Sequence, residues 1–215
     1  MFSLLFPPKC KFCRQLLKNE ETDLCRQCRT DAPEFLRAKR NIPFVAHWTA
    51  VWYYRDNVSR SIRRFKFYNA RSYAQLYGKV LAQKLQQDER FSFDILSWVP
   101  VSPLRRLRRG YDQAQLLAEV AGKELGIKPV RTLTKHHHTP PQSQLKSISK
   151  RRANVLNVYR VSNPEMIRDK RILLLDDVVT TGATCSECAK TLQMAGAKQV
   201  LFAALAAASQ DKLSR

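Results

Sequence analysis

The chain has 215 residues, of which 44% are hydrophobic, and it contains no run near the ~18 apolar residues that a membrane span needs. This length suits one medium α/β domain with room for a small extra module. The formal net charge of +20 is concentrated in the middle of the chain, so we expect a polyanion or a heavily phosphorylated small molecule as partner. A basic surface kept only for solubility is the alternative, but such long acid-free blocks are unusual for ordinary surface charge.

The first forty residues hold four of the six cysteines and show little periodicity. They begin with a few apolar residues and no basic n-region, so we expect no signal peptide and a cytoplasmic protein. The cysteines form two CxxC pairs, Cys10 with Cys13 and Cys25 with Cys28. This spacing predicts a zinc ribbon over residues 1–42, with a structural Zn²⁺ because four thiolates leave no open coordination position. Two disulfides are the alternative, disfavoured without a secretory signal.

Regular patterns begin near residue 47 and alternate between strands and helices. Trp48, Ala50, Trp52 and Tyr54 recur on one face of the first predicted strand. In chain order, we expect a strand at 46–55, a helix at 72–87, a strand at 93–100, a helix at 111–126, strands at 154–161 and 171–177, a helix at 185–196 and a strand at 199–206. Ser72 is the expected cap of the first helix, and Gly126 and Gly196 end the other two. This alternation implies a parallel sheet with helices on both faces.

Two further features have a structural and a functional interpretation. Residues 135–152 show no helix or strand pattern and are long for a connector, so we expect a functional loop there. Cys185 and Cys188 form a third CxxC on a predicted helix, where we expect core residues rather than spare metal ligands. The histidines at 136–138 are interpreted as part of a polar tract.

The segment RILLLDDVVTTGAT, residues 171–184, carries the strongest chemical signal. Asp176 and Asp177 end a buried strand, where ligands of parallel sheets bind. A loop rich in hydroxyls and free N–H groups follows and suits a phosphate; it consists of Thr180, Thr181, Gly182, Ala183 and Thr184. Paired carboxylates can accept hydrogen bonds from a vicinal diol or approach hydrated Mg²⁺, so a ribose 5-phosphate has both matching parts. The chain lacks GxxxxGK[ST] and GxGxxG, and an ordinary capped helix would leave the two acids and three threonines unexplained.

This segment resembles the PRPP motif of type I phosphoribosyltransferases. Five segments resemble, in order, the ComF (GntX-like) family of competence proteins: CKFC…CRQC, RRFKFYNAR, VPVSPLRRLRRGYDQAQLLAEVA, TPPQSQLKSISKRRANV and LLLDDVVTTGATCSECAKTLQMAGA. The departures are mild. Tyr111 and Asp112 stand where the family usually has an aromatic residue and Asn, and Asn69 or Ala70 stands where a glycine is common.

The resemblance implies a type I phosphoribosyltransferase-like α/β domain over residues 43–215, in which a parallel sheet is flanked by helices and preceded by the zinc ribbon. It implies that Asp176 and Asp177 are catalytic residues facing the ribose hydroxyls and Mg²⁺, and that the loop at 180–184 holds the 5-phosphate of PRPP. The pyrophosphate would lie on the turn that ends the strand at 93–100; the residues implied in this turn and just beyond it are Val101, Ser102, Arg105 and Arg109. The mobile hood near 135–154 would contribute Gln142, Arg151 and Asn154.

The family is tied to uptake of single-stranded DNA in natural transformation, on the cytoplasmic side of the inner membrane, so the resemblance also implies DNA and other DNA-uptake proteins as partners. Candidate nucleic-acid contacts are Arg63, Arg64, Lys66, Arg105, Arg106, Arg108, Arg151 and Arg152. In SIRRFKFYNARSY, aromatic residues are interleaved with arginine and lysine. These aromatic residues either stack on nucleobases or belong to the core. Two hypotheses stay open: an active phosphoribosyltransferase, and a nucleic-acid-handling protein that keeps a phosphoribose site. A zinc-ribbon transcription regulator is a third hypothesis, which leaves residues 176–184 unexplained.

Overall fold

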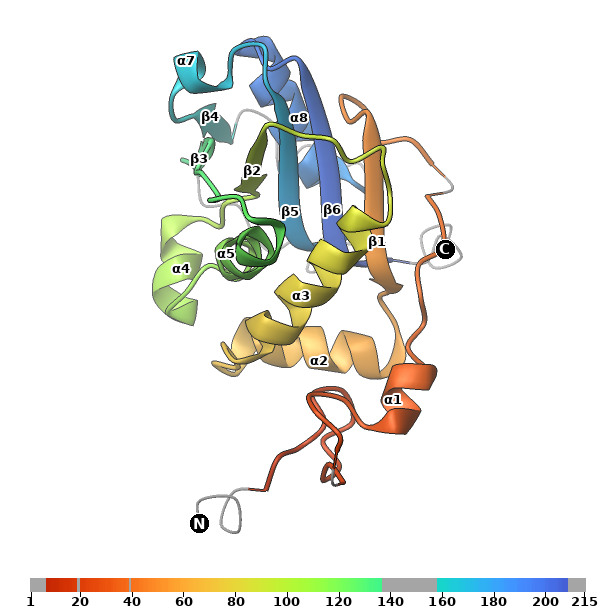
Figure 1. Ribbon diagram of the computed structural model, residues 1–215. Helices are drawn as coiled ribbons and strands as arrows, with labels where there is room; N and C mark the ends of the chain where they lie inside the picture. Colours follow the sequence, from red (N-terminus) through yellow and green to blue (C-terminus); the bar gives the residue numbers. More distant parts are fainter. Residues whose placement is uncertain (1–6, 19, 39, 137–157, 209–215) are drawn as a thin grey trace.

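The computed structural model describes residues 7–18, 20–38, 40–136 and 158–208. Its centre is a four-stranded parallel sheet with the strand order β1-β6-β5-β2 (Figure 1). The strands are β1 (His47–Tyr53), β2 (Ile95–Trp98), β5 (Arg171–Val179) and β6 (Gln199–Ala207). The two central strands, β5 and β6, are buried along most of their length, which explains their continuous apolar sequences. The predicted α/β class with a parallel sheet is therefore confirmed.

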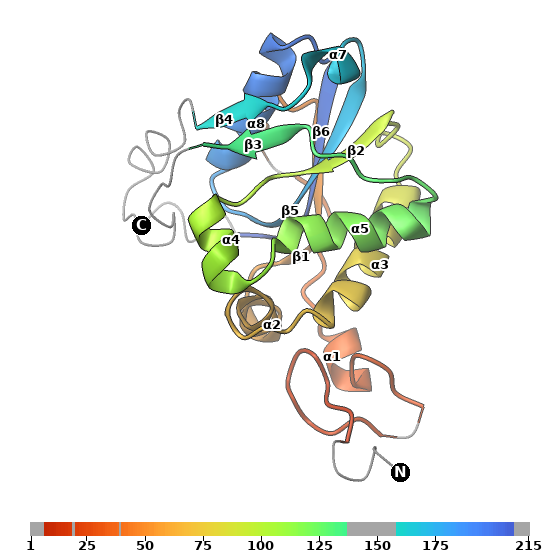
Figure 2. The same cartoon turned by 90° about the vertical axis from the view of Figure 1, so that its left-hand side faces the viewer.

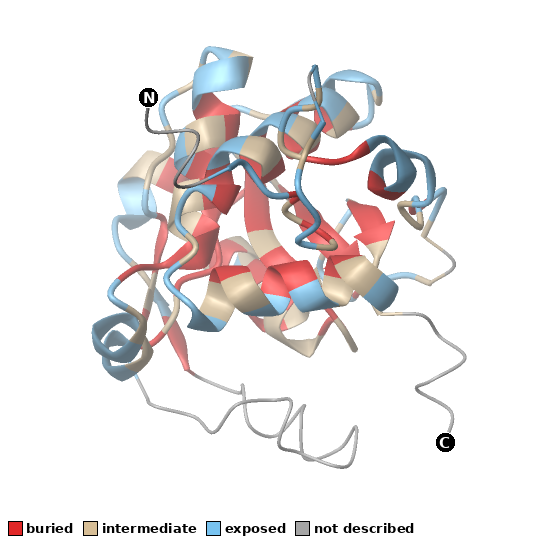
Figure 3. Cartoon of the chain, turned by 90° about the horizontal axis from the view of Figure 1, so that it is seen from below, coloured by how far each residue is buried: buried red, intermediate tan, exposed pale blue. Residues whose placement is uncertain are grey.

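Helices cover both faces of this sheet. On one face, α3 (Tyr73–Gln86) and α5 (Gln113–Leu125) pack against each other, with α2 (Asp56–Phe67) across their lower ends (Figures 1 and 2). The other face is covered by α8 (Ala183–Met194). Alternate residues of β5 supply the two sides of the core: Leu173 and Leu175 belong to the α3–α5 side, while Ile172 and Leu174 belong to the α8 side. Viewed from below, the buried residues follow the strands and the inner faces of the helices (Figure 3).

Each edge of the sheet is covered by a short stretch of chain. At the β1 edge, the Phe35 amide donates to the Val51 carbonyl (2.9 Å) and the Tyr53 amide donates to the Pro33 carbonyl (2.7 Å). β1 is buried on both faces from residue 49 to 52. At the β2 edge, the Val130 amide donates to the Leu96 carbonyl (2.8 Å), and the chain continues into β3 (Leu133–Lys135). β3 pairs antiparallel with β4 (Tyr159–Val161).

Several boundaries differ from the predictions. Ser72 has a helical backbone and makes no capping hydrogen bond, so it does not cap α3 as expected, whereas Gly126 ends α5 in the left-handed region as predicted. Lys135 is a strand residue, so the irregular loop begins later than expected. Residues 154–157 of the predicted strand, and 137–157 as a whole, lie outside the described residues. In the part of the chain that the structure describes, four helices were not predicted: α1 (Arg26–Thr30), α2, α4 (Pro103–Arg109) and α7 (Pro164–Ile167).

The N-terminal cysteine segment packs against α2, below the sheet in Figure 1. Phe12 is 1% exposed and meets Trp52 edge to face, with the ring centroids 5.3 Å apart. The Ser61 hydroxyl donates to the Lys11 carbonyl (2.6 Å), and the Arg64 guanidinium donates to the carbonyls of Lys11 (2.9 Å) and Phe12 (2.5 Å). The cysteine segment is therefore part of the main core and not an independent appendage.

Among the described residues, no helix has the length and apolar character that crossing a membrane would require.

Candidate functional site

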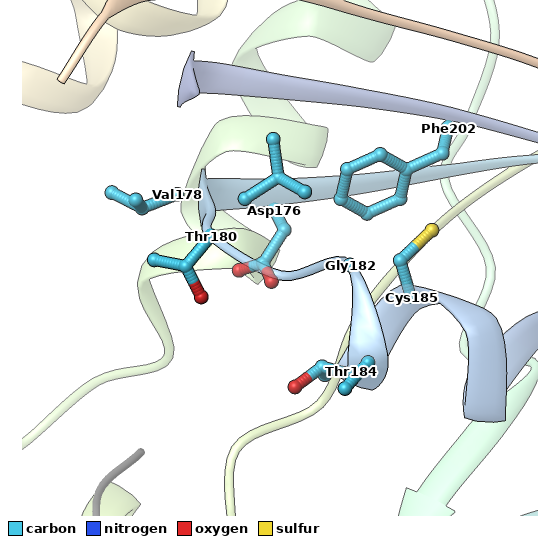
Figure 4. A pocket seen from close by; sticks show the side chains of 9 residues that line it. Asp176, Val178, Thr180, Gly182, Thr184, Cys185 and Phe202 are labelled. Atoms are coloured by element: carbon cyan, nitrogen blue, oxygen red, sulfur yellow. The ribbon is translucent and has the colours of Figure 1, made fainter. Parts of the chain in front are cut away.

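The end of β5 and the start of α8 enclose a hollow at the carboxyl edge of the sheet (Figure 4). Its lining residues are Asp176, Val178, Val179, Thr180, Gly182, Ala183, Thr184, Cys185 and Phe202. Four of the five predicted phosphate-loop residues are therefore in the lining. The fifth, Thr181, supports the loop, since its hydroxyl accepts a hydrogen bond from the Ala183 amide at 3.3 Å.

Gly182 is required at this turn for two reasons. Its φ of +79° lies in the left-handed region, and a Cβ atom there would come within 3.0 Å of the Ile42 side chain. The Gly182 carbonyl accepts the Ser186 amide at 2.8 Å, which starts α8. The loop is fixed from outside by Arg40, whose guanidinium donates to the Thr180 carbonyl. The hollow therefore presents the N-terminal turn of a long helix together with two threonine hydroxyls, a suitable environment for an anion.

The two adjacent acids point to opposite sides of β5, as successive strand residues do. Asp176 lines the hollow on the α8 side. Asp177 lies on the opposite face, the α3–α5 side, where one of its carboxylate oxygens is 2.8 Å from the Lys66 ammonium. Burial and then the charge of Asp177 raise the pKa of Asp176 well above its usual value. A bound cation or a pair of hydroxyl donors would relieve this repulsion.

The loop between β2 and α4 lies beside these acids, because the Val99 amide donates to the Leu175 carbonyl at 3.0 Å. Ser102 caps α4 by accepting the Arg105 amide, and Pro103 occupies the first turn. Asp112 ties this loop to α5, since its carboxylate accepts the Val101 amide (3.2 Å) and the Gln115 amide (3.2 Å). Burial raises the pKa of Asp112, and hydrogen bonds from these amides oppose the shift.

The predicted arginines of this loop have different environments. Arg105 is half-buried, and burial followed by the charge of Arg109 lowers its pKa. Arg109 donates to Gln113 at 2.8 Å and stands over the ring of Phe67, 4.9 Å from its centroid. The predicted hood residues Gln142, Arg151 and Asn154, and the predicted nucleic-acid residue Arg152, lie outside the described residues.

Lys135 is a residue of the site region that the sequence did not indicate. It ends β3 at the same edge of the sheet as Asp176, and it is only 8% exposed. Its ammonium lies 5.2 Å from the centroid of the Tyr159 ring and 3.4 Å from the Tyr159 hydroxyl. Burial and then the charge of Arg105 lower the pKa of Lys135 to about 8. Among the described residues it forms no salt bridge, and the charge of Asp176 offsets only part of the effect of burial.

Replacing Lys135 with methionine is expected to stabilise the unliganded protein by about 1–3 kcal/mol at pH 7, since the lowered pKa measures the cost of the buried charge. The folded lysine loses its proton near pH 8 and the unfolded one near its ordinary 10.5. The wild type should therefore gain stability as the pH rises between these values, and the variant should lack that gain. Urea unfolding at a series of pH values measures the difference. A destabilised variant at pH 7 would contradict the expectation.

The four N-terminal cysteines form the predicted cluster. The sulfur atoms of Cys10, Cys13, Cys25 and Cys28 lie within 4.8 Å of one another. The Cys13 and Cys25 sulfurs are 3.7 Å apart, close to the ~3.8 Å between thiolates that a tetrahedral zinc with ~2.3 Å bonds requires. All six cysteines of the chain are free thiols, in agreement with a metal site and not with two disulfides. Burial raises the pKa of Cys10, but hydrogen bonds from backbone amides outweigh it and lower that pKa to about 7.

The third CxxC belongs to the core, as predicted. Cys185 is 2% exposed and Cys188 is fully buried, and burial raises the pKa of both thiols. The Cys185 sulfur points toward Phe202, behind the hollow (Figure 4). Neither residue belongs to the four-cysteine cluster.

Together, the parallel sheet, the acids at its carboxyl edge and the glycine-bounded loop define a phosphoribosyltransferase fold. The family model of the phosphoribosyl transferase domain matches residues 107–215. Among curated proteins, the chain is 30% identical to Competence protein F of Haemophilus influenzae over 74% of the chain and 71% of that protein. It is 29% identical to Competence protein ComFC of Streptococcus pneumoniae over 87% of the chain and 77% of that protein. It is 28% identical to DNA utilization protein YhgH of Salmonella typhimurium over 89% of the chain and 86% of that protein.

The chain therefore belongs to the ComF family of competence proteins, which carry a phosphoribosyltransferase domain. The resemblance stated from the sequence is confirmed.

Proposed function

We propose that this protein binds PRPP or a related ribose phosphate with Mg²⁺ at the hollow between β5 and α8. The observation that carries the proposal is the pairing of Asp176 with the Thr180–Thr184 loop in one lining. The amides and hydroxyls of the loop suit the 5-phosphate, and the acids suit the ribose diol. Asp176 and Asp177 would also hold Mg²⁺, which neutralises phosphate charge when bound. The pyrophosphate would extend toward Val101, Ser102 and Arg105.

The four-cysteine cluster is proposed to hold a structural Zn²⁺. Four thiolates select zinc among the common ions, and they leave no coordination position for a substrate. The support comes from the sulfur distances described above and from the burial of the cluster under α2. Its role would be to fix the N-terminal segment on the core.

Single-stranded DNA is proposed as the macromolecular partner. A small sugar phosphate needs only a few cations, whereas the chain carries a net charge of +20. The names of the relatives, competence and DNA utilization proteins, support a role in DNA uptake during natural transformation. We place this activity on the cytoplasmic side of the membrane, next to other DNA-uptake proteins. Two predicted DNA contacts have other partners, since Arg64 binds backbone carbonyls and Lys66 binds Asp177.

The affinity for an oligothymidine is expected to fall steeply with salt, because each neutralised phosphate releases a counterion. A slope of about −0.7 per contacted phosphate is expected in a plot of log affinity against log salt concentration. Fluorescence anisotropy at a series of salt concentrations measures it. A slope near zero would contradict the electrostatic account.

A conventional small-molecule phosphoribosyltransferase is the alternative, favoured by the completeness of the loop and acid pair. The discriminating assay is pyrophosphate release from PRPP with nucleobases, amines or DNA as acceptors. Release with a nucleobase or an amine would support the alternative. Binding of PRPP without release would support a phosphoribose site used for recognition.

A further inference from the structure

Large apolar side chains are exposed on two neighbouring segments beside the phosphoribose site. At the end of α2, Phe67 is 62% exposed and Tyr68 is 76% exposed. On α4, Leu104 is 46% exposed and Leu107 is 80% exposed, and no residue of this helix is buried. The aromatic residues of SIRRFKFYNARSY therefore fall into two groups. Phe65 and Tyr73 belong to the core, while Phe67 and Tyr68 face solvent. Exposed aromatic rings of this size commonly mark a binding surface.

These two segments form one continuous surface. The Arg109 guanidinium at the end of α4 stands over the ring of Phe67, and α4 and the end of α2 lie next to each other in both views (Figures 1 and 2). The Arg71 side chain donates to the carbonyl of Gly110 (2.8 Å), which ties the chain after α2 to the end of α4. We name this region the α2–α4 surface; it comprises Arg63, Phe67, Tyr68, Leu104, Arg106, Leu107 and Arg108.

The charge of the α2–α4 surface is positive. Arg63, Arg106 and Arg108 are exposed, and none of them forms a salt bridge with a described carboxylate. Asp112, in the segment that follows α4, is buried, and its carboxylate accepts hydrogen bonds from backbone amides. A partner that is both anionic and rich in flat apolar surface fits this combination best.

The backbone that carries the two rings is held by the end of α2. Phe67 is the last residue of α2, and the Tyr68 amide donates to the Arg64 carbonyl at 2.9 Å, so the end of the helix holds both residues. Arg63 lies one turn before Phe67 and therefore on the same side of the helix. A rigid base for the rings lowers the conformational entropy lost when a ligand binds.

We propose that the α2–α4 surface binds single-stranded DNA by stacking unpaired bases on Phe67 and Tyr68, while Arg63, Arg106 and Arg108 contact the phosphates. This inference rests on the proposed DNA-binding function and assigns its location. Single strands fit better than a duplex, because base pairing hides the base faces that aromatic rings stack on. The absence of acids among the exposed residues of this surface favours a polyanion over a protein partner. Since Lys66 binds Asp177 and Phe67 follows it directly, the bound strand would pass beside the phosphoribose site.

The test compares two fluorescent single strands of equal length, an oligothymidine and an oligomer of abasic deoxyribose phosphates. The double variant Phe67→Ala, Tyr68→Ala should bind oligothymidine at least about tenfold more weakly than the wild type, since stacking acts on each base. Its affinity for the abasic oligomer should stay within about twofold. Tyr68→Leu, which keeps apolar area but removes the ring, should show part of the same selective loss. Phe44→Ala is the matched control, because Phe44 is 48% exposed and lies near α8, where Gln193 donates to its carbonyl.

Any of four results would overturn the proposal. Unchanged oligothymidine affinity in the double variant, or equal losses for both oligomers, would show that the rings do not stack on bases. Loss of binding to phosphatidylglycerol vesicles with DNA binding intact would identify a membrane-docking surface instead. If the wild type bound neither oligomer, the proposed DNA-binding function itself would fail, and that failure is visible before any variant is made.

Discussion

Replacing Cys25 with serine is expected to lower the free energy of unfolding by several kcal/mol and to abolish stoichiometric zinc. Cys25 is 8% exposed and belongs to the four-cysteine cluster. Its sulfur also caps α1 by accepting a hydrogen bond from the Cys28 amide. Structural zinc sites contribute ~10–16 kcal/mol in apparent terms, so losing one ligand has a large effect. Metal analysis together with thermal unfolding, with and without a chelator, measures both quantities.

The control for this prediction is Cys185→Ser, because Cys185 is a buried thiol outside the four-cysteine cluster. It should lose some core stability but keep its zinc content. An unchanged unfolding midpoint after zinc is stripped from the wild type would contradict a structural metal site.

The effect should spread beyond the cysteine segment. Ser61 and Arg64 of α2 bind the carbonyls of Lys11 and Phe12, and Lys66, in the last turn of the same helix, binds Asp177. Loss of the metal would therefore weaken the support of α2 and, through it, the salt bridge at the acid pair.

The second large effect is expected for the double variant Asp176→Ala, Asp177→Ala. In the wild type, PRPP–Mg²⁺ at one hundred times its dissociation constant should stabilise the fold by about 2.7 kcal/mol, which raises the melting temperature by about 5–10 °C in a chain of this size. The double variant should lose this rise, because it lacks the oxygens proposed to accept the diol and to hold Mg²⁺. Differential scanning fluorimetry with and without ligand measures the shift.

Asp94→Ala is the matched control. Asp94 is also an acid next to β5, but it lies at the opposite end of the strand, where it accepts the Arg171 amide at 2.8 Å. Hydrogen bonds from the Arg171 guanidinium and then from the Arg171 amide lower the pKa of Asp94 to about 2. The Asp94 variant should start from a lower melting temperature because it loses this pair, and its ligand-dependent rise should remain. An undiminished rise in the double variant would remove Asp176 and Asp177 from the site.

The strands and helices with regular apolar periods were predictable from the sequence. The apolar run of β5 and the glycine-bounded loop after it placed the hollow correctly, because burial and a left-handed turn each leave a direct mark on residue type. The environments of Asp176 and Asp177 could not be predicted from the apolar pattern of the strand alone. Their opposite orientations follow from strand geometry, but the salt bridge from Lys66 depends on how α2 crosses the helices above it.

The missed helices have two different causes. α2 carries Val58, Ile62 and Phe65 at helical spacing, but the interspersed arginines obscured this pattern. α4 buries no residue, so it has no apolar period to detect, and only the cap at Ser102 and the stop at Gly110 mark its ends. The position of Lys135 depends on the pairing of β3 with β4, which brings together residues on both sides of a long connection. Pairing of this kind has no local sequence signal.

The most direct test of the central claim is calorimetric titration of PRPP into the zinc-loaded wild-type protein, with and without Mg²⁺. We predict saturable binding at one site per chain that is strengthened by Mg²⁺ and displaced by ribose 5-phosphate. Absence of saturable binding in the presence of Mg²⁺, in protein that carries its zinc, would contradict the assignment of the hollow as a phosphoribose site.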